Sequence, residues 1–105
     1  MRTLSYKVVG QRLIPVGDHT GLIMGSKGYL QAKFEFDNDW KDCKIVASFY
    51  SDGEEHAKPL DKDGICMIPP EALTKTIFEL RVEGRKSDYR ILTNRIREKQ
   101  SGGDI

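Results

Sequence analysis

Apolar and polar residues alternate along much of this chain, and the alternation predicts β-strands. From Tyr29 to Phe36 the apolar side chains occupy every second position, with polar or charged residues between them. Similar runs cover Lys44 to Tyr50 and Ile77 to Glu83. Because successive side chains of a strand point to opposite faces of its sheet, each run predicts one strand with a core face and a solvent face.

Shorter runs extend this pattern over the rest of the sequence. They predict further strands at Leu4 to Val8, Arg12 to Val16, Leu22 to Met24, His56 to Leu60 and Ile65 to Ile68, and one or two strands between Tyr89 and Lys99. Asp63-Gly64 suits a tight hairpin turn with a positive φ, and Gly84 to Asp88 predicts another turn. Proline is accepted at a first helical position, so Pro69-Pro70 allows at most one short helical turn near residues 69–74.

These elements together define the expected fold class. Turn signals recur about every 8 to 12 residues, and no long stretch places apolar side chains at helical spacing. The sequence therefore predicts an all-β protein, an antiparallel β-sandwich of about seven to eight short strands. A chain of 105 residues can bury one core. We expect a single domain over residues 1–100, followed at residues 101–105 by a flexible tail or the start of a linker.

Composition and cysteine content narrow the class of protein. Hydrophobic residues make up 38% and charged residues 31% of the chain, as in ordinary globular proteins. The apolar runs are far shorter than the roughly 20 residues of a membrane-spanning helix, and the N-terminus has no secretory signal pattern. We expect no membrane association and synthesis in the cytoplasm. Cys43 and Cys66 form no C-x-x-C motif, which predicts buried reduced thiols, although a disulfide stays possible.

The net charge of +1 combines two segments of opposite sign. Residues 35–63 contain nine acids and four lysines, a net charge of −5. Residues 81–100 contain seven bases and three acids, a net charge of +4. Opposite patches can steer assembly between copies or with partners, and they are also typical of ordinary solvated faces.

No motif for catalysis or for a cofactor is recognisable. The two histidines, His19 and His56, lack a neighbouring nucleophile motif and are expected to be loop or surface residues. Gly25 to Gly28 does not follow the order of a phosphate-binding loop. The carboxylates of Asp37 to Asp42 do not match the ligand positions of an EF-hand, although an irregular, weak ion site would leave no motif. We therefore expect no enzymatic activity, no cofactor and no metal site.

Two groups of residues are candidates for protein binding. The acidic turn contributes Asp37, Asp39, Trp40 and Asp42. Tryptophan is enriched at interface hot spots, and it also commonly closes the end of a hydrophobic core. The basic C-terminal segment contributes Arg95 and Arg97, near Tyr89, a grouping that can also contact nucleic-acid phosphates and bases. The low net charge and the acidic middle argue against nonspecific nucleic-acid binding, and a nucleic-acid- or ligand-binding β-module that uses the basic C-terminal strand stays a further alternative.

Five short motifs add a resemblance to a known family. They are A-x-F-x-F-D-x-D-W (Ala32 to Trp40), V-A-x-F (Val46 to Phe49), D-G-x-C-x-I-P (Asp63 to Pro69), V-x-G (Val82 to Gly84) and T-N (Thr93-Asn94). From about Tyr29 to Ser101 the chain resembles small β-rich domains of tailed phages and prophages of Gram-positive bacteria, similar to the N-terminal domain of baseplate upper proteins. The resemblance implies a β-sandwich that docks onto a tail or baseplate. The chain departs from that plan by stopping at Ile105, as an excised domain or a small complete protein would.

The resemblance also implies a function. We expect a non-enzymatic structural domain of a phage tail or baseplate that acts through protein–protein contacts and forms homo-oligomers. It would lie in the host cytoplasm during synthesis and in the virion afterwards. The alternative is a small phage-encoded inhibitor that binds a host protein, such as a defence protein, or its ligand. For that alternative the acidic turns Asp37 to Asp42 and Ser51 to Glu55 are the candidate surface.

Overall fold

The computed structural model describes residues 1–102 of the chain. Residues 103–105, part of the tail expected at 101–105, lie outside the described residues. Ser101 is held by the preceding structure, because it forms an isolated parallel bridge with Ile23. Its backbone also makes hydrogen bonds with Leu22 and Met24, at 2.8 and 3.0 Å. The fold therefore extends past the predicted boundary at residue 100.

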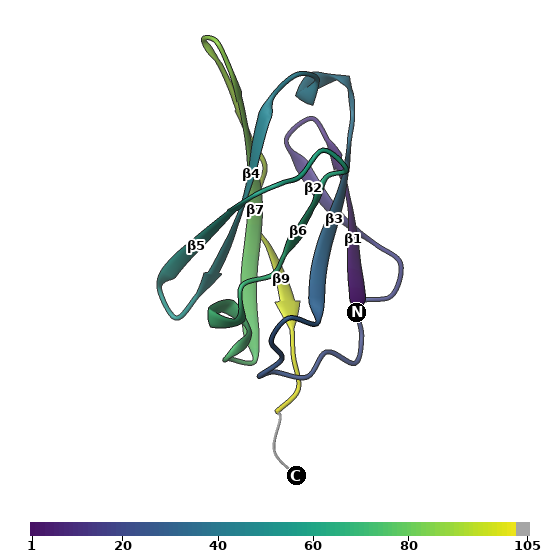
Figure 1. The fold of residues 1–105 in the computed structure, drawn as a ribbon, viewed down its shortest axis with the longest axis vertical. Helices are drawn as coiled ribbons and strands as arrows, with labels where there is room; N and C mark the ends of the chain where they lie inside the picture. The colour runs from purple at the N-terminus through teal and green to yellow at the C-terminus, as the bar shows by residue number, and fades with distance from the viewer. Residues whose placement is uncertain (103–105) are drawn as a thin grey trace.

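The described residues form nine strands in two sheets, a β-sandwich-like arrangement (Figure 1). The four-stranded sheet has the order β2 (Arg12–Val16), β1 (Arg2–Val9), β3 (Leu30–Phe36) and β6 (Ile65–Met67). The five-stranded sheet contains β5 (Glu54–Pro59), β4 (Lys44–Ser51), β7 (Ile77–Lys86), β8 (Tyr89–Leu92) and β9 (Ile96–Lys99). The predicted all-β fold class is confirmed.

The structure has nine strands, against the predicted seven to eight, and the last segment, where one or two strands were expected, forms two. β8 pairs with the C-terminal part of β7 and β9 with its N-terminal part, and Thr93 and Asn94 lie between them. Leu22 to Met24 contributes only the single bridge at Ile23. Gly84 lies inside β7, so the predicted turn over Gly84 to Asp88 is confined to Ser87 and Asp88.

Strand direction agrees with the antiparallel expectation for every pair except β1 with β3. These two strands run parallel, with Leu4 opposite Ala32 and Val8 opposite Phe36. The segment between β2 and β3 carries the chain back along the sandwich, so β3 starts beside the start of β1. An alternating sequence gives no information on strand direction, and parallel neighbours need only a connection long enough to return.

Three connections cross between the sheets, and one of them, through η2 (Pro70–Leu73), joins β6 to β7. The turn η1 (Asn38–Trp40) joins β3 of one sheet to β4 of the other. The turn at Asp61 to Ile65 joins β5 to β6, which again belong to different sheets. Gly64 has a φ of +77° there, as predicted, but the hairpin predicted at Asp63-Gly64 is wrong. The local turn chemistry is correct, and the flanking strands pair elsewhere.

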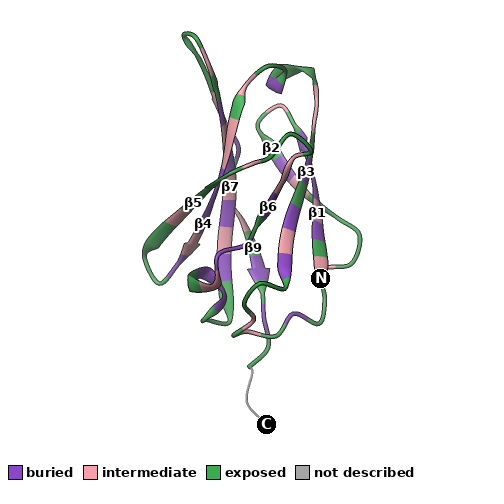
Figure 2. Ribbon diagram, viewed as in Figure 1, coloured by how far each residue is buried: buried purple, intermediate pink, exposed green. Residues whose placement is uncertain are grey.

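The hydrophobic core lies between the sheets, and the predicted core faces supply it (Figure 2). On β3 these residues are Leu30, Ala32 and Phe34, and on β7 they are Phe78, Leu80 and Val82. The helical turn predicted near residues 69–74 is the 3₁₀ turn η2 (Pro70–Leu73), which buries Ala72 and Leu73 at one end. A second 3₁₀ turn, η1, goes beyond the single turn expected. Among residues 1–102 both helical segments are far too short to span a membrane.

Candidate functional site

The structure separates the candidate binding residues into two places. Asp37, Asp39, Trp40 and Asp42 lie in and around η1, at the end of the sandwich where β3 passes to β4. Arg95 immediately precedes β9 and Arg97 lies within it, on the outer side of the five-stranded sheet. The six residues therefore do not form one site.

The acidic turn mainly has a structural role, because its side chains hold two connections of the fold together by hydrogen bonds. The Asp37 carboxylate accepts hydrogen bonds from the backbone N–H of Gly10, at 2.7 Å, and of Asp39, at 3.0 Å. The Trp40 indole N–H donates to the carbonyl oxygen of Gly10 at 2.8 Å. These bonds fasten the β1–β2 turn to the β3–β4 connection.

Trp40 is a core residue, which corrects its place among the candidates for partner binding. Its side chain is only 2% exposed and packs against Phe36, with ring centroids 5.2 Å apart. The ring also lies over Gly84, where an added Cβ would stand 2.8 Å from the indole Cε3. Of the four residues predicted in this turn, Asp39 and Asp42 are the exposed ones.

The outer face of the five-stranded sheet carries seven of the chain's 17 lysines and arginines, and we call it the basic face. Strand register turns seven basic side chains away from the core: Lys44, Arg81, Arg85, Arg90, Arg95, Arg97 and Lys99. Three glutamates share this face: Glu55, Glu79 and Glu83. These ten side chains give the basic face a net charge of +4. Strand pairing thus places the basic C-terminal segment on one side of one sheet.

Ion pairs organise the charges of the basic face. Glu79 lies 3.1 Å from the Nε of Arg97 and 3.6 Å from a terminal nitrogen of Arg95. Glu83 accepts a hydrogen bond from the Nε of Arg90 at 2.8 Å and another from the Nε of Arg85. The hydrogen bonds from Arg90 and Arg85 lower the pKa of Glu83 from 4.5 to about 2. Glu83 is therefore held as the ionised partner of its two arginines.

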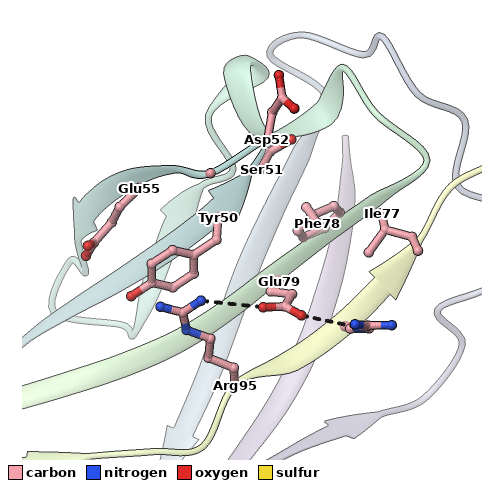
Figure 3. Close-up of a pocket in the computed structure, with 10 residues that line it drawn as sticks. Tyr50, Ser51, Asp52, Glu55, Ile77, Phe78, Glu79 and Arg95 are labelled. Carbon is pink, nitrogen blue, oxygen red and sulfur yellow. Dashed lines mark hydrogen bonds and ion pairs between the residues drawn. The ribbon is translucent and has the colours of Figure 1, made fainter.

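A hollow of about 500 Å³ opens on the basic face beside Glu79 (Figure 3). Arg95 covers the ring of Tyr50, with its guanidinium carbon 3.6 Å from the ring centroid, a favourable cation–π geometry. The hydroxyl groups of Tyr50 and Ser51 have no hydrogen-bond partner among the described residues. Asp52 and Glu55, from the second predicted acidic turn, also line the hollow. The site thus offers guanidinium donors beside carboxylates.

This chemistry suits recognition of charged groups. Arginine forks bind carboxylates or phosphates through paired hydrogen bonds. Within residues 1–102, no group of three or more His, Cys, Asp or Glu side chains is placed to hold a metal ion. Both cysteines are free thiols; Cys66 is buried and Cys43 half-buried. Burial raises the pKa of the Cys66 thiol from 9.0 to about 12, so it stays neutral at physiological pH.

One polar cluster was not accessible to sequence reasoning. His19, expected in a loop or at the surface, is only 12% exposed, and its Nδ1 lies 2.6 Å from a Glu98 carboxylate oxygen. The buried Tyr6 hydroxyl donates to the same oxygen at 2.6 Å. Burial and the Glu98 carboxylate raise the pKa of Tyr6 well above 10.0. These three residues are far apart in the sequence and form no motif, so only the fold brings them together.

Comparison of the chain with models of protein families, with curated proteins and with solved structures gives no match. The similarity to baseplate domains therefore rests on the five sequence motifs alone. The structure defines the chain as a β-sandwich-like domain with a charged sheet face.

Proposed function

We propose that this chain is a binding domain that acts through protein–protein contacts and catalyses no reaction. The basic face carries the proposal. It presents ten charged side chains on a regular sheet surface: nine come from β4, β5, β7, β8 and β9, and Arg95 immediately precedes β9. Its two central glutamates, Glu79 and Glu83, are engaged by arginines. This arrangement favours recognition of another charged surface over proton transfer to a substrate.

The motif resemblance supports a more specific form of the proposal. The chain would be a structural domain of a phage tail or baseplate, found in the host cytoplasm during synthesis and later in the virion. Its partners would be tail or baseplate proteins and further copies of itself. A β-sandwich suits such a role because strand pairing fixes the spacing of the side chains on its outer faces.

The alternative is a phage-encoded inhibitor of a host protein, such as a defence protein, or of that protein's ligand. One feature of the structure supports this alternative. Asp52 and Glu55 of the turn from Ser51 to Glu55 line the same hollow as Arg95 and Arg97. A host protein that binds there would have to match both acidic and basic groups, and this requirement would make binding selective.

Affinity capture tests the proposal. The tagged full-length chain is expressed in phage-infected host cells, and its partners are identified by mass spectrometry against an unrelated tagged β-domain. Tail or baseplate proteins are expected, together with a multimer in light scattering of the purified chain. Enrichment of a host protein without virion proteins would support the inhibitor instead. If no protein is enriched above the control, the chain is not a protein-binding domain.

A further inference from the structure

The basic face contains two groups with the same composition and the same bonding pattern. In each group, two arginines hold one glutamate of β7. The first group is Glu79 with Arg95 and Arg97, and the second is Glu83 with Arg85 and Arg90. Figure 3 shows the first group, with Arg95 reaching from the residue before β9 towards Glu79. The repetition means that one face of one sheet presents two similar charged centres.

Each group has an unused capacity to bind an anion. Two guanidinium groups and one carboxylate leave a net charge of +1. Arg85, Arg90 and Arg97 bond their glutamates through Nε, and their terminal nitrogens make no hydrogen bond to any described residue. These three side chains are 66%, 52% and 68% exposed. Their two terminal N–H groups form the fork that matches the two oxygens of a carboxylate.

The spacing of the two groups defines what can bridge them. Glu79 and Glu83 are four residues apart on β7, which corresponds to about 13 Å along an extended strand. Residues four apart in an extended peptide lie on the same face and have the same spacing. We infer that the basic face binds an acidic, extended segment of a partner protein, with two carboxylates four residues apart seated on the two groups. This inference rests on the proposed protein-binding function and specifies the partner's chemistry.

The face favours a protein carboxylate over a nucleic acid. A phosphate backbone carries regularly spaced negative charges, and Glu55, Glu79 and Glu83 lie within the face that it would cover. Stacking of bases needs an open aromatic face, whereas Arg95 already covers the Tyr50 ring at 3.6 Å. Two separate carboxylates can each bind the terminal N–H groups of one arginine pair, while Glu79 and Glu83 keep their ion pairs.

Fluorescence anisotropy with designed peptides tests the inference. The probe is a labelled threonine- and serine-based peptide of about ten residues, extended in character, with two glutamates four positions apart. One matched peptide has glutamine at both positions, and another has its glutamates three positions apart, on opposite faces. We expect the first peptide to bind the full chain at low salt and the glutamine peptide to show no measurable binding. The peptide with glutamates three apart should bind about tenfold more weakly, and salt at about 0.15 M should weaken all binding.

Variants of the chain locate the binding. Arg95→Gln with Arg97→Gln, and separately Arg85→Gln with Arg90→Gln, should each weaken the first peptide about tenfold. Replacing the same pairs by lysine keeps the charge and removes the fork, so a smaller loss is expected. The matched control is Lys7→Gln with Lys33→Gln, which removes two exposed charges from the outer face of the other sheet and should leave the affinity unchanged. Thermal melts verify that each variant is folded.

Several results would overturn the inference. They are equal binding of the glutamate and glutamine peptides, tighter binding of a single-stranded DNA of equal charge, or unchanged affinity in both the glutamine and the lysine variants. If any of these occurs while affinity capture still retains a protein partner, the partner chemistry is wrong and the protein-binding function stands. If capture retains no partner, the function itself is wrong.

Discussion

At the scale of single residues, the structure explains positions that the motif resemblance left without a role. Asp37 binds the backbone of Gly10, Trp40 closes the core, and Gly84 makes room for the Trp40 ring. Only glycine fits at position 64, because the Cβ of any other residue at Gly64 would stand 2.5 Å from the carbonyl oxygen of Phe34. The motifs are thus requirements of the fold, and a resemblance built on them carries more information about fold than about partner.

Gly84→Ala should destabilise the protein by about 1–3 kcal/mol, because the new methyl group overpacks a closed part of the core. It would lie 2.8 and 2.9 Å from two Trp40 ring carbons and 3.1 Å from the Cβ of Cys43. Urea unfolding measures the loss. In a Trp40→Phe background the six-membered ring of the indole is absent, so the same substitution should cost clearly less. An equal cost in both backgrounds would contradict the contact with Trp40.

Asp37→Ala should cost about 1.5–3 kcal/mol, since hydrogen bonds to charged groups are worth about that much. The substitution leaves the N–H groups of Gly10 and Asp39 without their carboxylate partner. Asp39→Ala is the matched control, because Asp39 is exposed and its carboxylate accepts no hydrogen bond among the described residues. Its effect should stay within about 0.5 kcal/mol. Similar losses in the two variants, measured by chemical denaturation, would refute the structural role of Asp37.

At the scale of elements, alternation located most strands because one face of each is buried. β7 buries its predicted core face of Phe78, Leu80 and Val82, whereas Phe36 of β3 and Ile45 of β4 are only partly buried on theirs. Pairing partners could not be predicted, since a turn such as Asp63-Gly64 has the same local chemistry whether or not its flanking strands belong to one sheet. The basic face could not be predicted for the same reason. The sequence shows a basic segment, but only strand register places Arg81, Arg85 and Arg97 on one side with Glu79.

Between β8 and β9, Thr93 and Asn94 make hydrogen bonds that hold neighbouring strands in place. The Thr93 hydroxyl accepts a hydrogen bond from the buried N–H of Val82 at 3.1 Å. The Asn94 side-chain oxygen accepts from the N–H of Leu13 at 3.0 Å, which joins the two sheets. Thr93→Val keeps the shape and leaves the Val82 N–H without that acceptor, so a loss of about 1–3 kcal/mol is expected.

Asn94 offers a separate check of the connection between the sheets. Asn94→Asp keeps the oxygen that faces Leu13 and should retain most of the stability, whereas Asn94→Ala should lose about 1 kcal/mol. Amide hydrogen exchange at Leu13 is the sharper measurement, because it reports on the bond itself. Faster exchange is expected in the alanine variant only. Unchanged exchange in that variant would mean that the bond does not protect Leu13.

At the scale of the whole molecule, the two ends of the chain are tied together through the core. Tyr6 of β1 and His19 of the segment between β2 and β3 both contact Glu98 of β9. Beyond β9, Gln100 bonds to the backbone of Thr76 and Lys75, and Ser101 to that of Leu22. Loss of β9 would therefore expose buried polar groups in both sheets. We conclude that the described residues fold as one cooperative unit.

Alkaline pH should weaken this unit through Cys66 and Tyr6. The pKa of Cys66 is raised from 9.0 to about 12 by burial, and that of Tyr6 is raised well above 10.0 by burial and by Glu98. Above pH 9.0 the unfolded chain releases the Cys66 proton while the folded protein keeps it. Stability is therefore unaffected by this thiol below that pH and falls as pH rises towards about 12, by up to about 1.4 kcal/mol per pH unit.

Urea unfolding at about pH 8 and about pH 10.5 measures this loss, because the two values lie below and above the usual pKa of cysteine. Cys66→Ala removes the thiol, so its stability should fall less between the two pH values than that of the unmodified protein, even though it starts lower. Ile68→Val, a neighbouring core change without a titrating group, should lower stability by a similar amount at both pH values. Parallel losses in the cysteine variant and the unmodified protein would show that Cys66 ionises equally in the folded and unfolded states, and that solvent reaches this part of the core.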